Sequence, residues 1–339
     1  MKQNNNFINK YPIEYVLQKC IRQGKVFSRM SPNQKALLVR ELQKDSGEMV
    51  GMWGDGANDC SALKASDAGL SLSEAEASIV APFTSKVPNI SSAWILLRLG
   101  RASLDLSFEL LKYMMVYSCI QFWSTCILYQ ATSGISDTQL VYYDMGCVVP
   151  ITILLCWTEA RDKLAPSLPV GTLISAPILT SIVGQMVIQS ACQVGAYFMI
   201  EGMDWFHHQH RSDDTHVHNY ETTTIFLFTL PQYLFIGLAF HISTEFRQPL
   251  YTNIPFVVML TLGACLSYWM ILLPMSWMRY WLQLRRLRMY FKVMIAGGTL
   301  VNGWFTLLWE QVVNCVFGKS EVIKKRPPIE FKQPEQEHS

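Results

Sequence analysis

The chain has 339 residues, of which 50% are hydrophobic and 16% are charged, and its formal net charge at pH 7 is +2. Because this charge is small and no basic patch interleaved with aromatic residues occurs in the polar part of the chain, we expect no nucleic-acid partner. The nine cysteines form no CxxC pair and most lie in apolar stretches, which favours small buried side chains over disulfides or zinc ligands.

Hydropathy divides the chain into three parts. Residues 1–103 are mixed and charged, residues 104–317 contain long apolar stretches with few charges between them, and residues 318–339 are rich in Pro, Lys and Glu. We therefore expect a soluble head, a membrane domain and a disordered tail. The first seven residues contain no apolar run, so we expect no secretory signal there, and the first membrane helix would direct insertion.

A well-specified helix start occurs early in the head, after a short predicted strand at residues 25–27. Ser31 is suited to the N-cap, Pro32 to the first helical position, and Gln34 completes a capping box. Lys35 would then lie in the first turn, where the positive end of the helix dipole disfavours a cation unless an anion binds nearby. The alternative is a lysine that only faces solvent.

The stretch at residues 51–60 joins an apolar run to two acids, an amide and two turn glycines. We expect a buried strand over residues 48–53, a tight turn, and a helix that begins at Asp59. In an open parallel sheet, ligands bind beyond the carboxyl ends of the strands. Asp55 and Asp59 suit Mg²⁺, which prefers oxygen ligands and phosphate, and Asn58 can donate to a phosphate oxygen. The alternative is an Asx-rich turn without a ligand.

A further strand over residues 67–72 and a short helical turn over residues 73–78 predict a parallel α/β sheet, since strands alternate with helices.

Three segments of the head resemble the phosphorylation domain of a P-type ATPase. They are residues 27–35, residues 54–59 (Gly-Asp-Gly-Ala-Asn-Asp) and residues 73–86. The last segment is most similar to the fifth class, B subgroup, the polyamine-transporting ATPases of lysosomes and endosomes.

This resemblance implies that the head is the C-terminal half of a haloacid-dehalogenase-like phosphorylation domain. It also implies catalytic roles, in which Lys35 contacts an aspartyl-phosphate and Asp55 binds Mg²⁺. Asn58 and Asp59 would complete the phosphate and metal network, with Asp59 as a second metal ligand and with Lys35 and Asn58 holding the phosphate. Mg²⁺ and ATP are the cofactors that the resemblance implies for the complete pump.

The sequence also departs from the pattern of this family. It contains no Asp-Lys-Thr-Gly-Thr, so the aspartate that the family phosphorylates is absent from it. The nucleotide-binding domain, the Thr-Gly-Glu loop of the actuator domain and four earlier membrane helices are absent as well. The chain thus resembles the C-terminal third of such a pump. We expect it to need the N-terminal part as a partner, because phosphoryl transfer requires its acceptor.

Six stretches of the membrane domain are long enough to cross a bilayer, which takes about 20 apolar residues for each helix. They are residues 106–129, 139–158, 172–200, 222–243, 254–275 and 292–316. Basic residues flank the first, second, fourth and last stretches and, by the positive-inside rule, place the head and the tail in the cytosol. A basic segment at residues 276–292 breaks the rule, since the five predicted crossings before it would place it in the lumen. Its interleaved Trp and Tyr residues indicate an amphipathic interfacial segment, with an extra crossing as the alternative.

Polar residues interrupt the first two stretches. Tyr113, Tyr117, Gln121 and Thr125 recur every four residues and so share one helix face, and Asp144 lies inside the second stretch. An acid within a membrane is costly unless it is paired or hydrated, and it marks a transport path unless it only bonds to a neighbouring helix. No Lys or Arg inside another apolar stretch offers Asp144 a partner, whereas a cationic substrate would.

In the family that the chain resembles, the corresponding tyrosine, glutamine and aspartate line the polyamine path, which implies substrate-binding roles for Tyr117, Gln121 and Asp144. The faces of the tyrosine rings would add cation–π attraction. Glu109 and Lys112, one turn apart at the cytosolic edge, are expected to form a local ion pair.

A loop at residues 201–221 contains a group of histidines that could bind zinc or sense pH, but their spacing fits no metal pattern and favours a solvated loop. These histidines are His207, His208, His210, His216 and His218.

We therefore expect part of an ATP-driven P-type pump, a multi-pass membrane protein of late endosomes or lysosomes. Its expected partners are membrane lipid and a cationic small molecule, a polyamine above all. One alternative is a non-catalytic regulatory or binding subunit derived from such a pump, and another is the same class of pump with an inorganic cation or a lipid as cargo. Because the phosphate acceptor is absent, the sequence leaves open whether this chain alone is an enzyme.

Overall fold

The computed structural model of the chain describes residues 19–21, 23–47, 49–74, 76–165, 168–206, 218–242 and 245–317. Two compact units make up the chain, Met1–Leu97 and Arg98–Ser339, and each is described by itself. The predicted tail at residues 318–339 lies outside the described residues, and so do all the loop histidines except His218.

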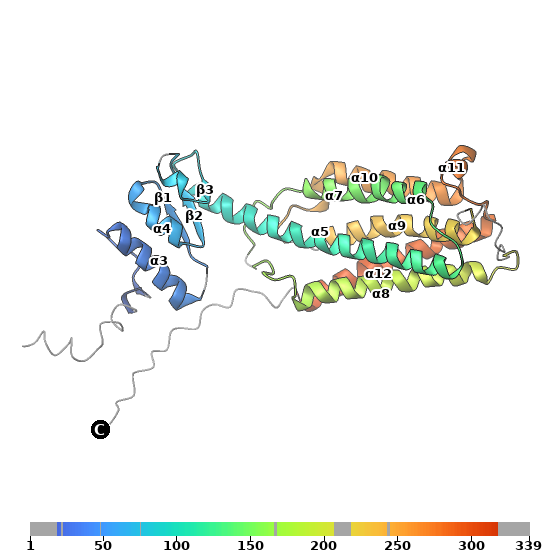
Figure 1. The fold of residues 1–339 in the computed structure, drawn as a ribbon, viewed down its shortest axis with the longest axis horizontal. Coiled ribbons are helices and arrows are strands. Elements are labelled where there is room, and N and C mark those ends of the chain that lie inside the picture. Colours follow the sequence, from blue (N-terminus) through green and yellow to red (C-terminus); the bar gives the residue numbers. More distant parts are fainter. Residues whose placement is uncertain are drawn as a thin grey trace, which may run out of the picture. The chain divides into compact units, whose positions relative to one another are not determined.

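The first unit contains a small parallel sheet between short helices. In chain order its elements are α3 (Pro32–Ser46), β1 (Gly51–Gly54), the 3-10 helix η1 (Ala57–Asp59), α4 (Cys60–Ala65), β2 (Ala68–Ser71), the 3-10 helix η2 (Glu76–Ile79) and β3 (Phe83–Thr84). The strand order is β1-β2-β3, and both pairings are parallel, with Gly51 opposite Ala68 and Leu70 opposite Phe83 (Figure 1). The predicted succession of strand, turn and helix is present, but β1 spans Gly51–Gly54 instead of residues 48–53 and is only partly buried, and the 3-10 helix η1 precedes α4, which begins at Cys60.

Two details of the first unit differ from the prediction. Residues 25–27 form no strand, because Val26 is 85% exposed and no described strand pairs with this segment. β3 was not predicted, since two residues are too few to show an alternating pattern. The start of α3 agrees with the prediction: the Ser31 N–H donates to Gln34 Oε1 at 2.9 Å, and Pro32 occupies the first turn.

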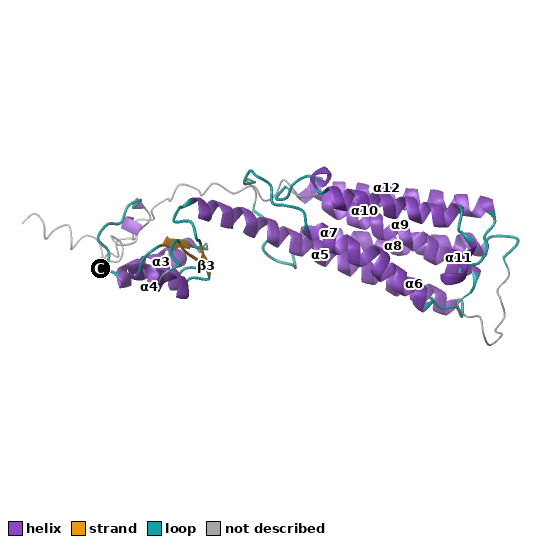
Figure 2. Cartoon of the chain, turned by 90° about the horizontal axis from the view of Figure 1, so that it is seen from above, coloured by secondary structure: helices purple, strands orange, loops and turns teal. Residues whose placement is uncertain are grey.

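The second unit is a bundle of long helices (Figure 2). Its described elements are α5 (Ser91–Gln130, which starts in the first unit), α6 (Asp137–Val141), the π-helix η3 (Tyr142–Val148), α7 (Val149–Cys156), α8 (Ala176–Glu201), α9 (Tyr220–Ile242), the 3-10 helix η4 (Leu250–Thr252), α10 (Ile254–Leu272), α11 (Ser276–Trp281) and α12 (Met289–Phe317). Helix α9 lies among η3, α8, α10 and α12, and nearly all of it is buried. This explains why apolar residues occur on every side of α9 instead of on one stripe.

Five described helical segments are long and apolar enough to cross a membrane, which makes the chain a membrane protein. They are Asp137–Cys156, Ala176–Glu201, Tyr220–His241, Ile254–Leu272 and Met289–Phe317. The first predicted span, residues 106–129, lies within α5, which is not one of the five. Helix α5 bears Asp105, Glu109 and Lys112 before its apolar part and several polar side chains within it, so its mean hydropathy is low.

Candidate catalytic and substrate sites

The turn after β1 brings two of the predicted head residues together. Lys35, in the first turn of α3, donates from Nζ to Asp59 Oδ1 at 2.7 Å. The anion that a cation at this helix start requires is therefore present in the chain itself. The side chains of Asp55 and Asn58 are exposed and form no hydrogen bond with any described residue. They are open to a ligand from outside.

Gly54 is needed because Asp59 folds back over the end of β1. A Cβ added at Gly54 would lie 2.6 Å from Asp59 Cβ and 2.7 Å from its Oδ2, which is closer than real Cβ contacts come. The Asp59 N–H donates to the Gly56 carbonyl at 3.0 Å, which fixes the tight turn. The glycine thus allows the carboxylate of Asp59 to lie beside Lys35.

Asp55 and Asp59 offer the carboxylate oxygens that Mg²⁺ prefers. Among the described residues, no group of three or more His, Cys, Asp and Glu side chains is arranged to hold a metal ion. Two carboxylates suit Mg²⁺ when phosphate and water supply its remaining oxygen ligands, because this ion retains several waters and needs few protein ligands. The residues present therefore fit a Mg²⁺–phosphate pair better than a closed metal site.

Asp67 is a positioning residue that sequence analysis did not single out. Its Oδ2 accepts from the Val50 N–H at 2.8 Å and from Gln43 Nε2 at 2.9 Å, so it links the end of α3 to the start of β1. The hydrogen bond from the Val50 amide, with the one from Gln43, lowers the pKa of Asp67 below its ordinary value of 3.8. One oxygen of this carboxylate thus accepts two hydrogen bonds from the chain, in contrast to Asp55.

The membrane residues Tyr117 and Asp144 meet between α5 and η3. The Tyr117 hydroxyl donates to Asp144 Oδ1 at 2.5 Å, and both side chains are only partly buried. Gln121 follows Tyr117 by one helical turn, so it lies on the same face of α5, and it is partly buried as well. The structure thus brings two of the three predicted substrate residues into contact and places the third beside them.

Asp144 belongs to a helix segment that is not regular. Residues Tyr142–Val148 form a π-helix, in which the Val149 N–H reaches the Asp144 carbonyl five residues back. Pro150 follows and has no N–H to donate to the preceding turn, which accounts for the looser winding. Such π-helical turns are frequent at functional sites, because they re-aim side chains and loosen backbone carbonyls.

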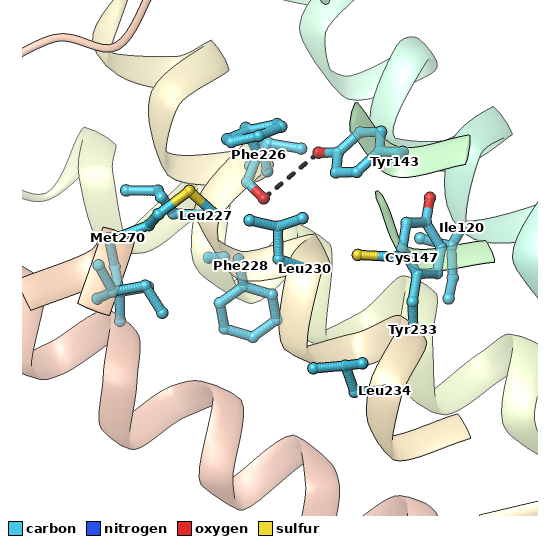
Figure 3. Close-up of a cluster of buried hydrophobic side chains, with 14 of the residues drawn as sticks. Ile120, Tyr143, Cys147, Phe226, Leu227, Phe228, Leu230, Tyr233, Leu234 and Met270 are labelled. Carbon is cyan, nitrogen blue, oxygen red and sulfur yellow. Dashed lines mark hydrogen bonds between the residues drawn. The ribbon is translucent and has the colours of Figure 1, made fainter. Parts of the chain in front are cut away.

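Aromatic rings surround this pair on the side of α9. The rings of Tyr117 and Tyr233 lie 5.5 Å apart, and those of Tyr143 and Tyr233 lie 5.3 Å apart. The Tyr143 hydroxyl donates to the Phe226 carbonyl at 3.3 Å (Figure 3). The hydroxyls of Tyr113 and Tyr233 are buried without a hydrogen-bond partner among the described residues. The wall beside Asp144 is therefore aromatic, with hydroxyl groups still available.

The expected local pair of Glu109 and Lys112 is wrong. Glu109 contacts the guanidinium of Arg247, which is 2% exposed and also has Nε 3.4 Å from Asp105 Oδ2. Lys112 instead has Nζ 3.7 Å from Glu310 Oε2. The guanidinium of Arg247 is more deeply buried than the ammonium group of Lys112 and needs anionic partners more, so the long-range pair forms in place of the neighbouring one.

A buried polar column extends from Glu310 along α8. Ser181 Oγ donates to Glu310 Oε1 at 2.8 Å, and Gln185 Nε2 donates to the same oxygen at 3.2 Å. The column continues through two more glutamines one turn apart, which bond to side chains of α12, α9 and α5. Its further members are Gln189, Thr306, Asn302, Gln232, Gln193, Thr229 and Ser124.

Sequence analysis missed this column, although a signal for it exists. Ser181, Gln185, Gln189 and Gln193 recur every four residues in an apolar stretch, the same pattern that singled out Tyr113 to Thr125 on α5. The pattern shows a polar face but not its partners. The structure shows that almost all of the hydrogen-bonding capacity of this face is used within the bundle.

No protein-family model matches the chain. It is 42% identical over 261 residues to the human polyamine-transporting ATPase 13A2, an alignment that covers 76% of this chain and 22% of that protein. It is 37% identical over 285 residues to the probable cation-transporting ATPase 13A4 of Gallus gallus (74% of this chain, 24% of that protein). It is 35% identical over 295 residues to the vacuolar cation-transporting ATPase YPK9 of Saccharomyces cerevisiae (87% and 20%). The chain thus spans less than a quarter of the length of these relatives.

Proposed function

Because the chain belongs to the 13A family of P-type ATPases, we propose that it works as part of an ATP-driven pump that moves a polyamine across an endolysosomal membrane. In this proposal the first unit is part of a haloacid-dehalogenase-like phosphorylation domain. Helix α5 adds a sixth membrane span to the five that hydropathy identifies. The head and the tail lie in the cytosol.

The contact between Tyr117 and Asp144 is the observation that supports this function most. It places a carboxylate inside a membrane helix, at a π-helical turn, with one hydroxyl as its only described hydrogen-bond partner. An unpaired acid in a membrane is costly, and an amine of a cationic substrate would supply the missing charge. The ring of Tyr117 would add cation–π attraction, and Gln121 would accept a hydrogen bond one turn away.

The head residues would serve the phosphorylation step. Asp55 and Asp59 would hold Mg²⁺, and the ion would neutralise charge on the transferring phosphoryl group. Lys35 and Asn58 would bind the phosphate, so Lys35 would exchange Asp59 for phosphate oxygens. Since the printed sequence holds no Asp-Lys-Thr-Gly-Thr, the acceptor aspartate and the ATP site would come from another part of the pump.

The test is spermine-stimulated ATP hydrolysis by a pump that includes this chain. Replacement of Asp144 by Asn should abolish the stimulation, because it removes the carboxylate but retains the size of the side chain. Expression and the phosphoenzyme level without spermine should stay near those of the wild type. Unchanged stimulation by spermine would contradict the assignment.

A second cargo is favoured by the relatives themselves, since two of those named above are described only as cation-transporting. If the cargo is an inorganic cation, K⁺ or a divalent ion should stimulate hydrolysis where spermine does not. A non-catalytic binding subunit would show neither response, while the chain itself would still bind the cation.

A further inference from the structure

A basic cavity lies between the end of α10, helix α11 and the start of α12. Its volume is about 510 Å³, and its polar wall consists of Ser276 and three cations, Arg279, Arg286 and Lys292. Leu273, Pro274 and Met289 contribute apolar surface to the same cavity. No Asp or Glu is among the lining residues, so three cations surround a space that holds no carboxylate of its own.

The three cations are not neutralised elsewhere in the part of the chain that the structure describes. The Arg279 side chain donates only to Ser276 Oγ, at 3.2 Å, and its Nε is buried without a partner among the described residues. Lys292 Nζ donates to the Leu272 carbonyl at 2.9 Å, near the C-terminal end of α10, and no described acid pairs with Arg286. Like charges held together in this way repel one another, and a bound anion would remove the cost.

Contacts place the cavity at the end of the bundle where α5 connects to α6. Gln139 Nε2, near the start of α6, donates to the Leu282 carbonyl at 2.7 Å, and His218 Nδ1 lies 2.9 Å from the Gln283 carbonyl. Helix α11 lies at this same end (Figure 1). Its six residues are too few for an extra crossing, so the segment lies at one membrane surface.

Helix α11 also exposes aromatic side chains of the kind that lie among lipid headgroups. Trp277, Tyr280 and Trp281 are 61%, 85% and 69% exposed. Trp and Tyr are enriched at membrane–water interfaces, because their rings are apolar and their tips are polar. The cavity therefore opens where a phospholipid would present its phosphate, and the exposed Leu273 and Met289 would contact the upper acyl chains.

We propose that this cavity binds the phosphate of an anionic phospholipid in the leaflet on this side of the membrane. Arg279 and Arg286 would make charge-assisted hydrogen bonds to the phosphate oxygens, and Lys292 would add a third positive charge. A lipid fits better than free phosphate, because more than half of the lining residues are apolar and the cavity lies next to interfacial aromatic residues. The proposal also explains why a strongly basic segment lies on the side where the positive-inside rule predicts few basic residues.

The test is lipid retention by the full chain, measured by native mass spectrometry with equal amounts of phosphatidylglycerol and phosphatidylcholine. Wild type should retain phosphatidylglycerol in preference. Arg286→Gln should weaken that preference about tenfold, which corresponds to about 1.4 kcal/mol. Because Arg286 is exposed, this change should not impair folding. The double variant Arg279→Gln/Arg286→Gln should abolish the preference.

Arg288→Gln is the matched control, since it removes the same charge from the same segment. Its guanidinium lies over the Trp205 ring at 5.7 Å and does not line the cavity. This variant should retain the wild-type preference. Equal losses in Arg286→Gln and Arg288→Gln would overturn the proposal in favour of general surface charge. Displacement of the lipid by millimolar inorganic phosphate would overturn it in favour of a free anion, and no preference in the wild type would overturn it outright.

Discussion

Arg247 and Asp144 both lie within the helical unit, but the chain surrounds them in different ways. Arg247 is buried against Glu109 and Asp105, and its Nη1 donates to the Leu155 carbonyl at 3.4 Å. Asp144 is half-buried at a π-helical turn and has the Tyr117 hydroxyl as its one described side-chain partner. A charge that is paired with opposite charges of the chain contributes to the fold, whereas a carboxylate without a cationic partner in the chain is available to a cationic ligand.

Glu310 belongs with Arg247 in this comparison. Its Oε1 accepts hydrogen bonds from Ser181 and Gln185, and its Oε2 lies 3.7 Å from the ammonium group of Lys112, so the chain supplies both hydrogen bonds and a counter-charge. The comparison therefore predicts that changes at Arg247 and Glu310 affect stability, and that a change at Asp144 affects binding.

Replacement of Arg247 by Met should destabilise the chain most, by about 3–5 kcal/mol, because it leaves the buried Glu109 and the half-buried Asp105 without their cation. Denaturant unfolding of the full chain in lipid nanodiscs would measure the loss. Arg161→Met is the control, since Arg161 is an exposed arginine whose backbone pairs with the same segment. Similar stability of the two variants would contradict the structural role of Arg247.

Glu310→Gln should cost about 1–3 kcal/mol, because Lys112 loses its counter-charge while an oxygen remains to accept from Ser181. The same unfolding assay applies, with the exposed Glu201→Gln as the control. Spermine binding to the chain should not change. A loss of spermine binding with no loss of stability would instead show that Glu310 binds the ligand.

Gly54→Ala tests the same contrast in the head, where Asp55 is exposed and Asp59 is paired with Lys35. The new Cβ would meet Asp59, so we expect a cost of about 1–3 kcal/mol and separation of Asp59 from Lys35. Gly56→Ala is the control, since its Cβ would meet only the Asn58 amide nitrogen at 3.9 Å. Hydrogen exchange across residues 51–60 should rise in the first variant alone, and equal exchange in both would refute the packing role of Gly54.

Asp67→Asn should have the smallest effect, and the effect should depend on pH. Because the folded pKa of Asp67 is lowered, its ionised form stabilises the native head above the ordinary value of 3.8, and this contribution disappears as pH falls through the folded pKa. The variant should therefore exchange amide hydrogens at residues 49–54 faster than wild type near pH 6. The difference should vanish at acidic pH, and a difference that persists there would contradict the hydrogen-bond assignment.

Some of this contrast was predictable from the sequence. Asp144 is conspicuous because it is an acid in an apolar stretch, and the Gly-Asp-Gly-Ala-Asn-Asp turn is conspicuous because its glycines and acids follow a buried strand. Both signals come from residues that are neighbours in the sequence, so they can be recognised without knowledge of the tertiary structure. The predicted start of α3 at Pro32 is correct for the same reason.

The partners of the buried charges were not predictable. Spacing favours a pair between Glu109 and Lys112, but the guanidinium that contacts Glu109 comes from a connection more than a hundred residues away. The partners of Gln185 and Gln189 depend likewise on which helices pack against α8. Helix packing decides these pairings, and a single sequence shows only that a polar face exists.

Direct binding of radiolabelled spermine to the full chain in nanodiscs, with Asp144→Asn and Glu310→Gln measured side by side, would show whether Asp144 binds the substrate while Glu310 serves the fold. We predict that Asp144→Asn lowers the affinity at least about tenfold, or about 1.4 kcal/mol, and changes the unfolding free energy little. Glu310→Gln should bind spermine as wild type does and unfold more easily. Wild-type affinity in Asp144→Asn, or loss of affinity in Glu310→Gln alone, would contradict the account.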